Sequence, residues 1–160
     1  MTAIVRRAEP ADAEALIALI NALSAFVEDL PTRLTPEDIR RDGFGPGAWF
    51  DCFLAEQDGK AVGYAIVYFG FSTDHGGRGL HLADLYVDPA LRGGGLGRAL
   101  MSAAARHGRQ HGARWLVWDV WVKNHGAEAF YKALGARRYD DVFAMTLKGP
   151  ALEALANERP

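Results

Sequence analysis

Residues 84–100, with the sequence DLYVDPALRGGGLGRAL, combine the end of a strand, a glycine-rich turn and the start of a helix. Alternating apolar residues favour the strand, and Pro89 ends it because proline cannot donate a hydrogen bond to a sheet. Three consecutive glycines follow, and a helical pattern begins near Arg98. The free N–H groups and the positive dipole of a helix N-terminus bind anions. We therefore expect this turn, with Arg92 and Arg98, to hold the pyrophosphate of a nucleotide-like cofactor.

The best-known glycine motifs do not match this turn. A Rossmann fingerprint that starts at Gly93 would need glycine in place of Arg98. A phosphate loop would need a Gly-Lys-Ser/Thr triplet, which the sequence lacks. The pattern that is present is Arg-x-x-Gly-x-Gly, over residues 92–97. Taken alone, it leaves open a plain glycine-rich turn in front of a helix.

The length and composition favour one compact, cytoplasmic domain. The 160 residues suit a single domain, and a hydrophobic share of 49% is enough for a core. We expect the domain to cover residues 1–150, with residues 151–160 as a tail. The net charge of −2 gives no electrostatic case for binding nucleic acid or an anionic membrane. No signal peptide or membrane-spanning run is evident, and Cys52 has the surroundings of a buried thiol.

The order of the expected elements predicts a mixed sheet. Hairpin-like strands come first, with Asp58-Gly59 as a turn between two of them, and strands that alternate with helices follow. We expect an α/β fold of the α+β type, with about six or seven strands and helices on both faces. The expected strands are residues 3–7, 49–57, 61–71, 80–87, 114–122 and 139–147. The expected helices run from Pro10 to about residue 30, from Thr35-Pro36 to about residue 43, and over residues 96–111, 124–134 and 151–156.

Two histidines on the expected helix 96–111 are the main candidates for a metal site. His107 and His111 are one helical turn apart, a spacing that suits a shared metal ion. The zinc-protease motif, however, would need glutamate in place of Gly108. The polar residues around both histidines favour a solvated helix face, so we expect no metal.

A second motif lies in residues 124–136, with the sequence NHGAEAFYKALGA. Asn124 is suited to cap a helix, and Ala127 and Tyr131 follow at helical spacing. Tyr131 on its own reads as an ordinary packed aromatic. The pattern Asn-x-x-Ala-x-x-x-Tyr follows Arg-x-x-Gly-x-Gly by about 30 residues, and two motifs in fixed order are more specific than either alone. Together they resemble the signatures of the GCN5-related N-acetyltransferase (GNAT) superfamily.

Further stretches resemble the diamine acetyltransferase branch, which includes the thialysine and spermidine/spermine acetyltransferases. These stretches are LTPEDIRRDGFG, GYAIVYFGFSTDHGGRGLHLADLYVDPALRGGGLG and AFYKALGA. The chain departs from that branch at Ala83-Asp84, where the branch usually has Glu-Asp. It departs again after Phe26, where Val27 takes the place of an acid and Glu28 follows. An extended polyamine needs carboxylates along its length, so these departures argue against a polyamine but not against an amine.

The resemblance implies an N-acetyltransferase that transfers the acetyl group of acetyl-CoA to a primary amine of a small molecule. It also implies direct attack in a ternary complex, a homodimer and no metal. The pantetheine arm would pair with the backbone of residues 85–87, between two splayed parallel strands. The implied acetyl-CoA contacts are Leu85, Tyr86, Val87, Arg92, Gly93, Gly94, Gly95, Leu96, Gly97, Arg98, Asn124, Ala127 and Tyr131.

The resemblance also suggests roles in catalysis. Tyr131 would donate a proton to the leaving thiolate. Asp84 would anchor the amine or act as a base through water, although a strand-end aspartate also often bonds local backbone. Phe26, Glu28 and Asp119 complete the candidate acceptor contacts, and the pattern does not fix which way Asp119 faces. Two rival functions stay open: an acyl-CoA-binding sensor without turnover, and a protein or peptide acetyltransferase that acts on lysines or N-termini.

Replacing Tyr131 with phenylalanine tests its role. We expect Tyr131→Phe to lower kcat by roughly ten- to a thousandfold, the usual contribution of a general acid. Steady-state kinetics that follow thiol release measure the effect. An unchanged kcat would remove Tyr131 from the mechanism.

Overall fold

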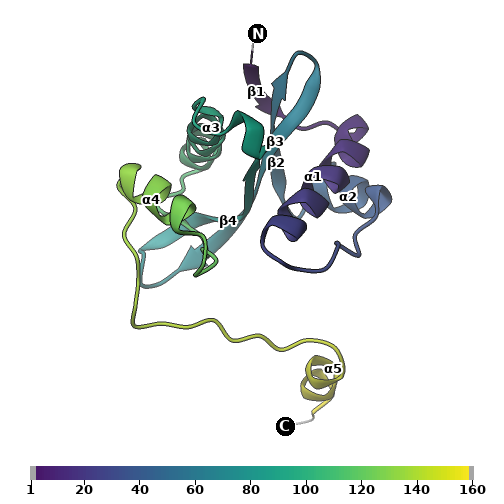
Figure 1. The fold of residues 1–160 in the computed structure, drawn as a ribbon. Helices are drawn as coiled ribbons and strands as arrows, with labels where there is room; N and C mark the ends of the chain where they lie inside the picture. The colour runs from purple at the N-terminus through teal and green to yellow at the C-terminus, as the bar shows by residue number, and fades with distance from the viewer. Residues whose placement is uncertain (1–2, 159–160) are drawn as a thin grey trace. The chain divides into compact units, whose positions relative to one another are not determined.

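The computed structural model describes residues 3–158, which form two compact units divided between Trp121 and Val122 (Figure 1). No helix in this part of the chain is both long and apolar enough to cross a membrane. The first unit contains β1 (Ala3–Arg7), η1 (Pro10–Asp12), α1 (Ala13–Phe26), α2 (Pro36–Gly43), β2 (Asp51–Gln57), β3 (Lys60–Ser72), β4 (Gly77–Val87), η2 (Pro89–Leu91), α3 (Leu96–Gln110) and β5 (Leu116–Val117). The second contains α4 (His125–Ala133) and α5 (Pro150–Ala156).

The sheet is mixed, as expected, and its strands lie in the order β1-β2-β3-β4-β5. The first four strands are antiparallel, and β5 is parallel to β4. Its five strands are fewer than the six or seven expected. Of the expected strand over residues 114–122, only β5 forms. The expected strand over residues 139–147 is not among the strands of the described chain. An apolar run becomes a strand only where a neighbouring strand pairs with its backbone. A sequence pattern does not predict whether such a neighbour is present.

Helices cover both faces of the sheet in the first unit, with α1 and α2 on one face and α3 on the other (Figure 1). On the first face, α1 and α2 bury apolar side chains against alternate residues of β2 and β3. This cluster includes Leu16, Ile20, Ile39, Leu54 and Tyr64. On the other face, α3 buries Leu100 and Ala104. The period of two in the strands therefore divides the core into two layers.

Local signals in the sequence predicted several element ends correctly. The Thr35 hydroxyl accepts a hydrogen bond from the Asp38 N–H at 3.2 Å, while the Asp38 carboxylate accepts one from the Thr35 N–H at 2.9 Å. This reciprocal cap starts α2 where it was expected. Asp58 and Gly59 both have positive φ, at 50° and 76°, which suits the tight hairpin between β2 and β3. In contrast, α1 ends at Phe26, earlier than predicted, because Glu28 adopts a left-handed φ of 61°.

The prediction of a solvated helix face was wrong for His107. Its side chain is buried, and its Nε2 lies 2.7 Å from Asp51 Oδ2. The Phe53 ring lies 5.6 Å from the imidazole. His107 follows Leu100 and Ala104 at helical spacing, so the helix turns it to the sheet despite its polar neighbours. Within residues 3–158, no three or more His, Cys, Asp or Glu side chains are grouped to hold a metal ion.

The buried pair of His107 and Asp51 generates a stability prediction. We expect Asp51→Ala to lower the free energy of unfolding by about 1–3 kcal/mol, because it leaves a buried imidazole without its partner. Arg7 also pairs with Asp51, but its side chain is 61% exposed. Arg7→Ala should therefore cost less than about 1 kcal/mol. Urea unfolding of both variants measures the difference, and equal costs would contradict the importance of the buried pair.

Candidate active site

One edge of β4 is paired with a strand over only part of its length. The edge of β4 that faces β3 is paired along the strand, from Gly77 to Val87. Toward β5, the pairing is limited to Leu80 with Leu116 and His81 with Val117. Within the described residues, no strand pairs with this edge beyond His81. The backbone of residues 85–87 therefore lies on an edge that can accept an extended ligand in the manner of an added strand.

The glycine turn follows directly from this edge. Gly93 and Gly95 have φ values of +82° and +87°, a region that favours glycine. Gly95 is the N-cap of α3, and its carbonyl accepts the Ala99 N–H at 2.9 Å as the helix begins. The N–H groups of the first helical turn precede the helix's own hydrogen bonds and are suited to an anion. A Cβ placed on Gly93 or Gly95 would meet nothing within 4 Å, so no protein atom blocks access to this side of the turn.

Arg92 connects the glycine turn to two other elements. Its Nε donates a hydrogen bond to the Val87 carbonyl at 3.0 Å, at the end of β4. Its guanidinium lies 4.4 Å from the centre of the Phe26 ring, at the end of α1, and 5.8 Å from that of Tyr86. The structure thus brings together Phe26, predicted as an acceptor contact, and Arg92, predicted as a cofactor contact. Arg98 is exposed on the first turn of α3.

Asp84 lies on β4 next to a β-bulge. Ile66 pairs with Asp84 and Val67 pairs with Leu82, so Ala83 is the extra residue of β4 at this point. Ala83 is exposed, whereas Asp84 is half-buried. Burial raises the pKa of the Asp84 carboxyl, and a hydrogen bond from Tyr64 opposes that rise. A raised carboxyl pKa next to a predicted ligand edge is typical of functional sites.

Tyr64 is the site residue that the sequence analysis missed. Its hydroxyl donates a hydrogen bond to Asp84 Oδ2 at 3.0 Å. Its side chain is fully buried, in the cluster beneath α1 and α2. The available signal was a tyrosine in a buried strand position, where the hydroxyl needs a partner. The sequence does not say which residue that partner is, because Asp84 lies on the neighbouring strand.

The second motif forms α4 in the second unit. The Asn124 side chain accepts a hydrogen bond from the Ala127 N–H at 3.1 Å, which confirms the predicted cap. Tyr131 lies on the same helix, with the Phe130 ring centre 5.1 Å away. Burial raises the pKa of Tyr131 to about 12, so its phenol stays protonated at neutral pH. Of the remaining candidates, Glu28 follows α1, and Asp119 is exposed after β5.

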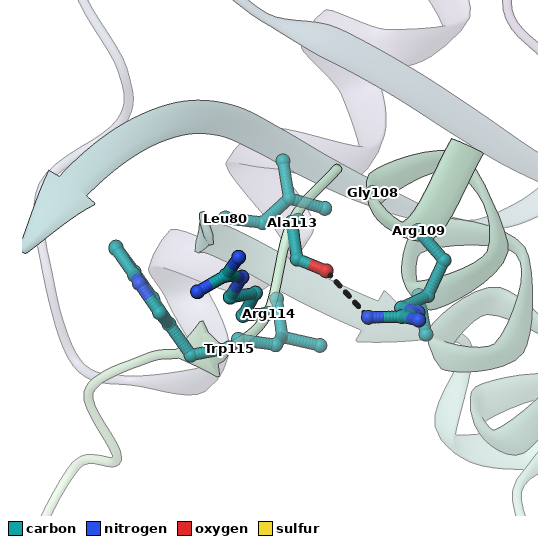
Figure 2. A pocket seen from close by; sticks show the side chains of 8 residues that line it. Leu80, Gly108, Arg109, Ala113, Arg114 and Trp115 are labelled. Atoms are coloured by element: carbon teal, nitrogen blue, oxygen red, sulfur yellow. Dashed lines mark hydrogen bonds between the residues drawn. The ribbon is translucent and has the colours of Figure 1, made fainter. Parts of the chain in front are cut away.

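Two pockets of the first unit lie apart from Asp84 and the glycine turn. Figure 2 shows a cavity of about 170 Å³ near the C-terminal end of α3. A helix of 15 residues is about 22 Å long, so this cavity and the glycine turn lie at opposite ends of α3. A pocket of about 440 Å³ lies beside the turn between β3 and β4, and His81 and Trp115 line it. Neither pocket is lined by Asp84 or the glycine turn.

The chain is similar to known acetyltransferases over almost its whole length. It is 31% identical to thialysine N-epsilon-acetyltransferase of Bos taurus, over 97% of this chain and 98% of that protein. It is 34% identical to mycothiol acetyltransferase of Amycolatopsis mediterranei, over 82% of this chain and 45% of that protein.

Solved structures share the fold. An integron cassette protein of V. cholerae superposes with a TM-score of 0.79 and 22% identity, covering 99% of both chains. An aminoglycoside acetyltransferase from an uncultured soil metagenomic sample gives a TM-score of 0.76 and 21% identity, over 92% of this chain and 100% of that one. Residues 18–136 match the acetyltransferase (GNAT) family. Because this match covers most of the chain and a relative is 31% identical over almost its whole length, this chain belongs to the GNAT family of acetyltransferases.

Proposed function

We propose that the protein transfers the acetyl group of acetyl-CoA to a primary amine of a small molecule, by direct attack of the amine in a ternary complex. The observation that carries this proposal is the edge of β4, which is unpaired beyond His81 among the described strands and leads into the glycine turn. GNAT enzymes use acetyl-CoA as their co-substrate. An extended pantetheine arm suits such an edge, and a pyrophosphate suits the helix N-terminus that follows.

Each candidate residue has a proposed part in holding acetyl-CoA. The backbone of Leu85, Tyr86 and Val87 pairs with the pantetheine amides. The N–H groups of the glycine turn hold the pyrophosphate, and Arg98 on the first turn of α3 adds positive charge. Arg92 contributes by fixing the turn against Val87 and Phe26 as well as by its charge. The remaining proposed contacts are Gly93, Gly94, Gly95, Leu96, Gly97, Asn124, Ala127 and Tyr131.

The proposed chemistry has three proton transfers. An alkyl amine with a pKa of about 10.4 must lose a proton before it attacks. Asp84 anchors the ammonium group or acts through water as the base that accepts that proton. The amine nitrogen then forms a bond to the acetyl carbon, the bond from that carbon to sulfur breaks, and the second proton on the nitrogen is released to water. Tyr131 donates its phenol proton to the departing sulfur and regains a proton from water; burial keeps the phenol protonated before the transfer.

The relatives and the residues near the bulge both support a small acceptor. The similar proteins are named for thialysine and mycothiol, and a structural neighbour is named for aminoglycosides. At the bulge this chain carries one carboxylate, because Ala83 stands beside Asp84. A single carboxylate suits one ammonium group better than the several of an extended polyamine. Phe26, Glu28 and Asp119 are the other proposed acceptor contacts.

The organisation of the protein is also part of the proposal. We propose that residues 1–150 act as one acetyltransferase domain with a C-terminal tail, that the protein is cytoplasmic, and that it forms a homodimer. Support for a dimer comes from two strongly exposed aromatic side chains in the first unit, Trp49 at 81% and Phe71 at 75%. Exposed apolar side chains mark a partner surface where they form one contiguous patch.

An amine panel tests the proposed activity. The protein is incubated with acetyl-CoA and thialysine, lysine, spermidine, an aminoglycoside or a lysine-containing peptide, and thiol release is followed. We expect turnover with a small amine, and a lower kcat/KM for spermidine than for thialysine. Tight binding of acetyl-CoA without turnover on any amine would indicate a sensor. Turnover on the peptide alone would indicate a protein acetyltransferase.

The glycine turn generates a separate binding prediction. Gly95→Ala places a Cβ on a left-handed residue at the N-cap of α3, which shifts the N–H groups that hold the pyrophosphate. We expect CoA affinity to fall about tenfold or more, which corresponds to about 1.4 kcal/mol. Isothermal titration calorimetry with CoA measures the loss.

Gly112→Ala is the matched control for that variant. Gly112 follows the other end of α3, has a φ of +82° and, like Gly95, has open space where a Cβ would lie. It carries the same backbone strain without contacting the proposed site. Both variants should lose a similar amount of stability, on the order of 1 kcal/mol. An equal loss of CoA affinity in both would show that strain, and not the turn's contact with the cofactor, causes the effect.

A further inference from the structure

We infer that Tyr64 is the residue that positions Asp84 for the acceptor amine. Its hydroxyl holds the carboxylate through Oδ2 and leaves Oδ1 as the oxygen that receives the amine. The inference rests on the proposed function, because it assigns a purpose to a contact within the proposed acceptor site. Tyr64 does not touch the reacting atoms in this scheme and acts through Asp84 alone.

The register of the sheet makes this contact. Tyr64 on β3 pairs with Tyr86 on β4, and Ile66 pairs with Asp84. Tyr64 and Asp84 are therefore diagonal neighbours on one face of adjacent strands, a separation that a long side chain spans. The distance from the Tyr64 hydroxyl to Asp84 Oδ2 is 3.0 Å. Because both residues sit on strands of the central sheet, the contact has a rigid base.

Packing alone does not explain a hydroxyl at position 64. The side chain is fully buried in an apolar cluster that includes Leu16, Ile20 and Cys52. Phenylalanine would fill nearly the same space without the cost of removing a hydroxyl from water. The hydroxyl is accounted for by its bond to Asp84. A phenol also holds the carboxylate without cancelling its charge, as an arginine or lysine would, so the charge stays available for an ammonium group.

The ionisable groups near Asp84 are few. On the strands nearest to it they are the phenols of Tyr64 and Tyr86 and the thiol of Cys52 on β2. Farther along the same face of the sheet, Arg6 on β1 pairs with Asp12 and Glu56. Burial and nearby carboxylates, Asp84 among them, raise the pKa of that thiol, which keeps it neutral. In α1, which packs on this face, Glu14 is the sole ionisable residue, and it is exposed.

Arg92 is the cation beyond Tyr86 on this face, and its guanidinium is 5.8 Å from the Tyr86 ring. Burial raises the pKa of Asp84, and the bond from Tyr64 opposes that rise. Loss of the Tyr64 hydroxyl therefore shifts the titration of Asp84 upward, because the carboxylate loses the donor that stabilises its charged form.

Tyr64→Phe tests the inference through the pH dependence of catalysis. Asp84 must be ionised to receive the amine, so we expect the acid limb of the kcat/KM profile to move up by about one pH unit. Below that limb, activity should fall about tenfold relative to the unaltered enzyme, and it should recover at higher pH. A limb that does not move would overturn the inference.

Tyr68→Phe is the matched control. It removes the same hydroxyl from another tyrosine of β3, one that is 41% exposed and stacks on His81. Its pH profile should match that of the unaltered enzyme. An equal shift in both variants would also overturn the inference, because it would show a general effect of losing a hydroxyl from β3.

A titration without substrate separates this inference from the proposed function. Nuclear magnetic resonance of protein labelled with ¹³C at the aspartate carboxyl and tyrosine Cζ positions follows Asp84 and Tyr64 directly. In the unaltered protein, the Tyr64 signal should move with the Asp84 midpoint, and in Tyr64→Phe that midpoint should rise. If the Tyr64 chemical shift does not change as Asp84 titrates, the inference is overturned. This result comes from the unaltered protein, so it holds even if the variant fails to fold. If Tyr64 and Asp84 titrate together but the protein acetylates no amine, the proposed function is overturned. The hydrogen bond from Tyr64 to Asp84 would then be a structural contact only.

Discussion

The two sides of β4 are held differently, and the proposed site follows from that difference. Pairing with β3 along the whole strand fixes its position from one side. On the other side, pairing with β5 covers only Leu80 and His81. The strand is therefore rigid although part of its other edge pairs with no described strand, a combination that suits a ligand bound through backbone hydrogen bonds. Because α3 begins at Leu96, after the glycine turn that follows the strand, the helix dipole acts near the end of the same edge.

Arg92 links this edge to the acceptor face. The residue belongs to the glycine turn, yet its side chain bonds the end of β4 and lies over Phe26 at the end of α1. A shift of α1 would therefore disturb the glycine turn. Conversely, a ligand bound to the glycine turn would restrain α1. Contact between a guanidinium and an aromatic face is worth about 0.5–1 kcal/mol at exposed sites and more when it is desolvated. The coupling is modest, but it joins the two proposed binding regions directly.

The sequence predicted those features of the site that neighbouring residues determine. The cap at Asn124 and the start of α3 each depend on a few adjacent residues, and both were predicted correctly. The contacts of His107 with Asp51 and of Tyr64 with Asp84 join residues 56 and 20 positions apart. No local sequence pattern predicts a contact between residues so far apart. His107 was therefore predicted to be exposed to solvent, and Tyr64 was not predicted as a site residue. The proposed roles of Tyr131 and Asp119 stay predictions.

The bulge at Ala83 explains why the sequence pattern could not predict which face of the sheet Asp84 occupies. Leu80 contacts the helix α3, because a Cβ on Gly108 would meet the Leu80 side chain at 2.5 Å. Strict alternation from Leu80 through Leu82 would turn residue 84 to that same apolar face. The extra residue in β4 shifts the alternation by one, so Asp84 instead pairs with Ile66 and meets Tyr64 beneath α1. Without the bulge the carboxylate would be directed to the α3 core, where a charge has no partner and a high cost. The bulge therefore determines on which side of the sheet an amine can meet this carboxylate, and Ala83 leaves Asp84 as the only acid at that point of the strand.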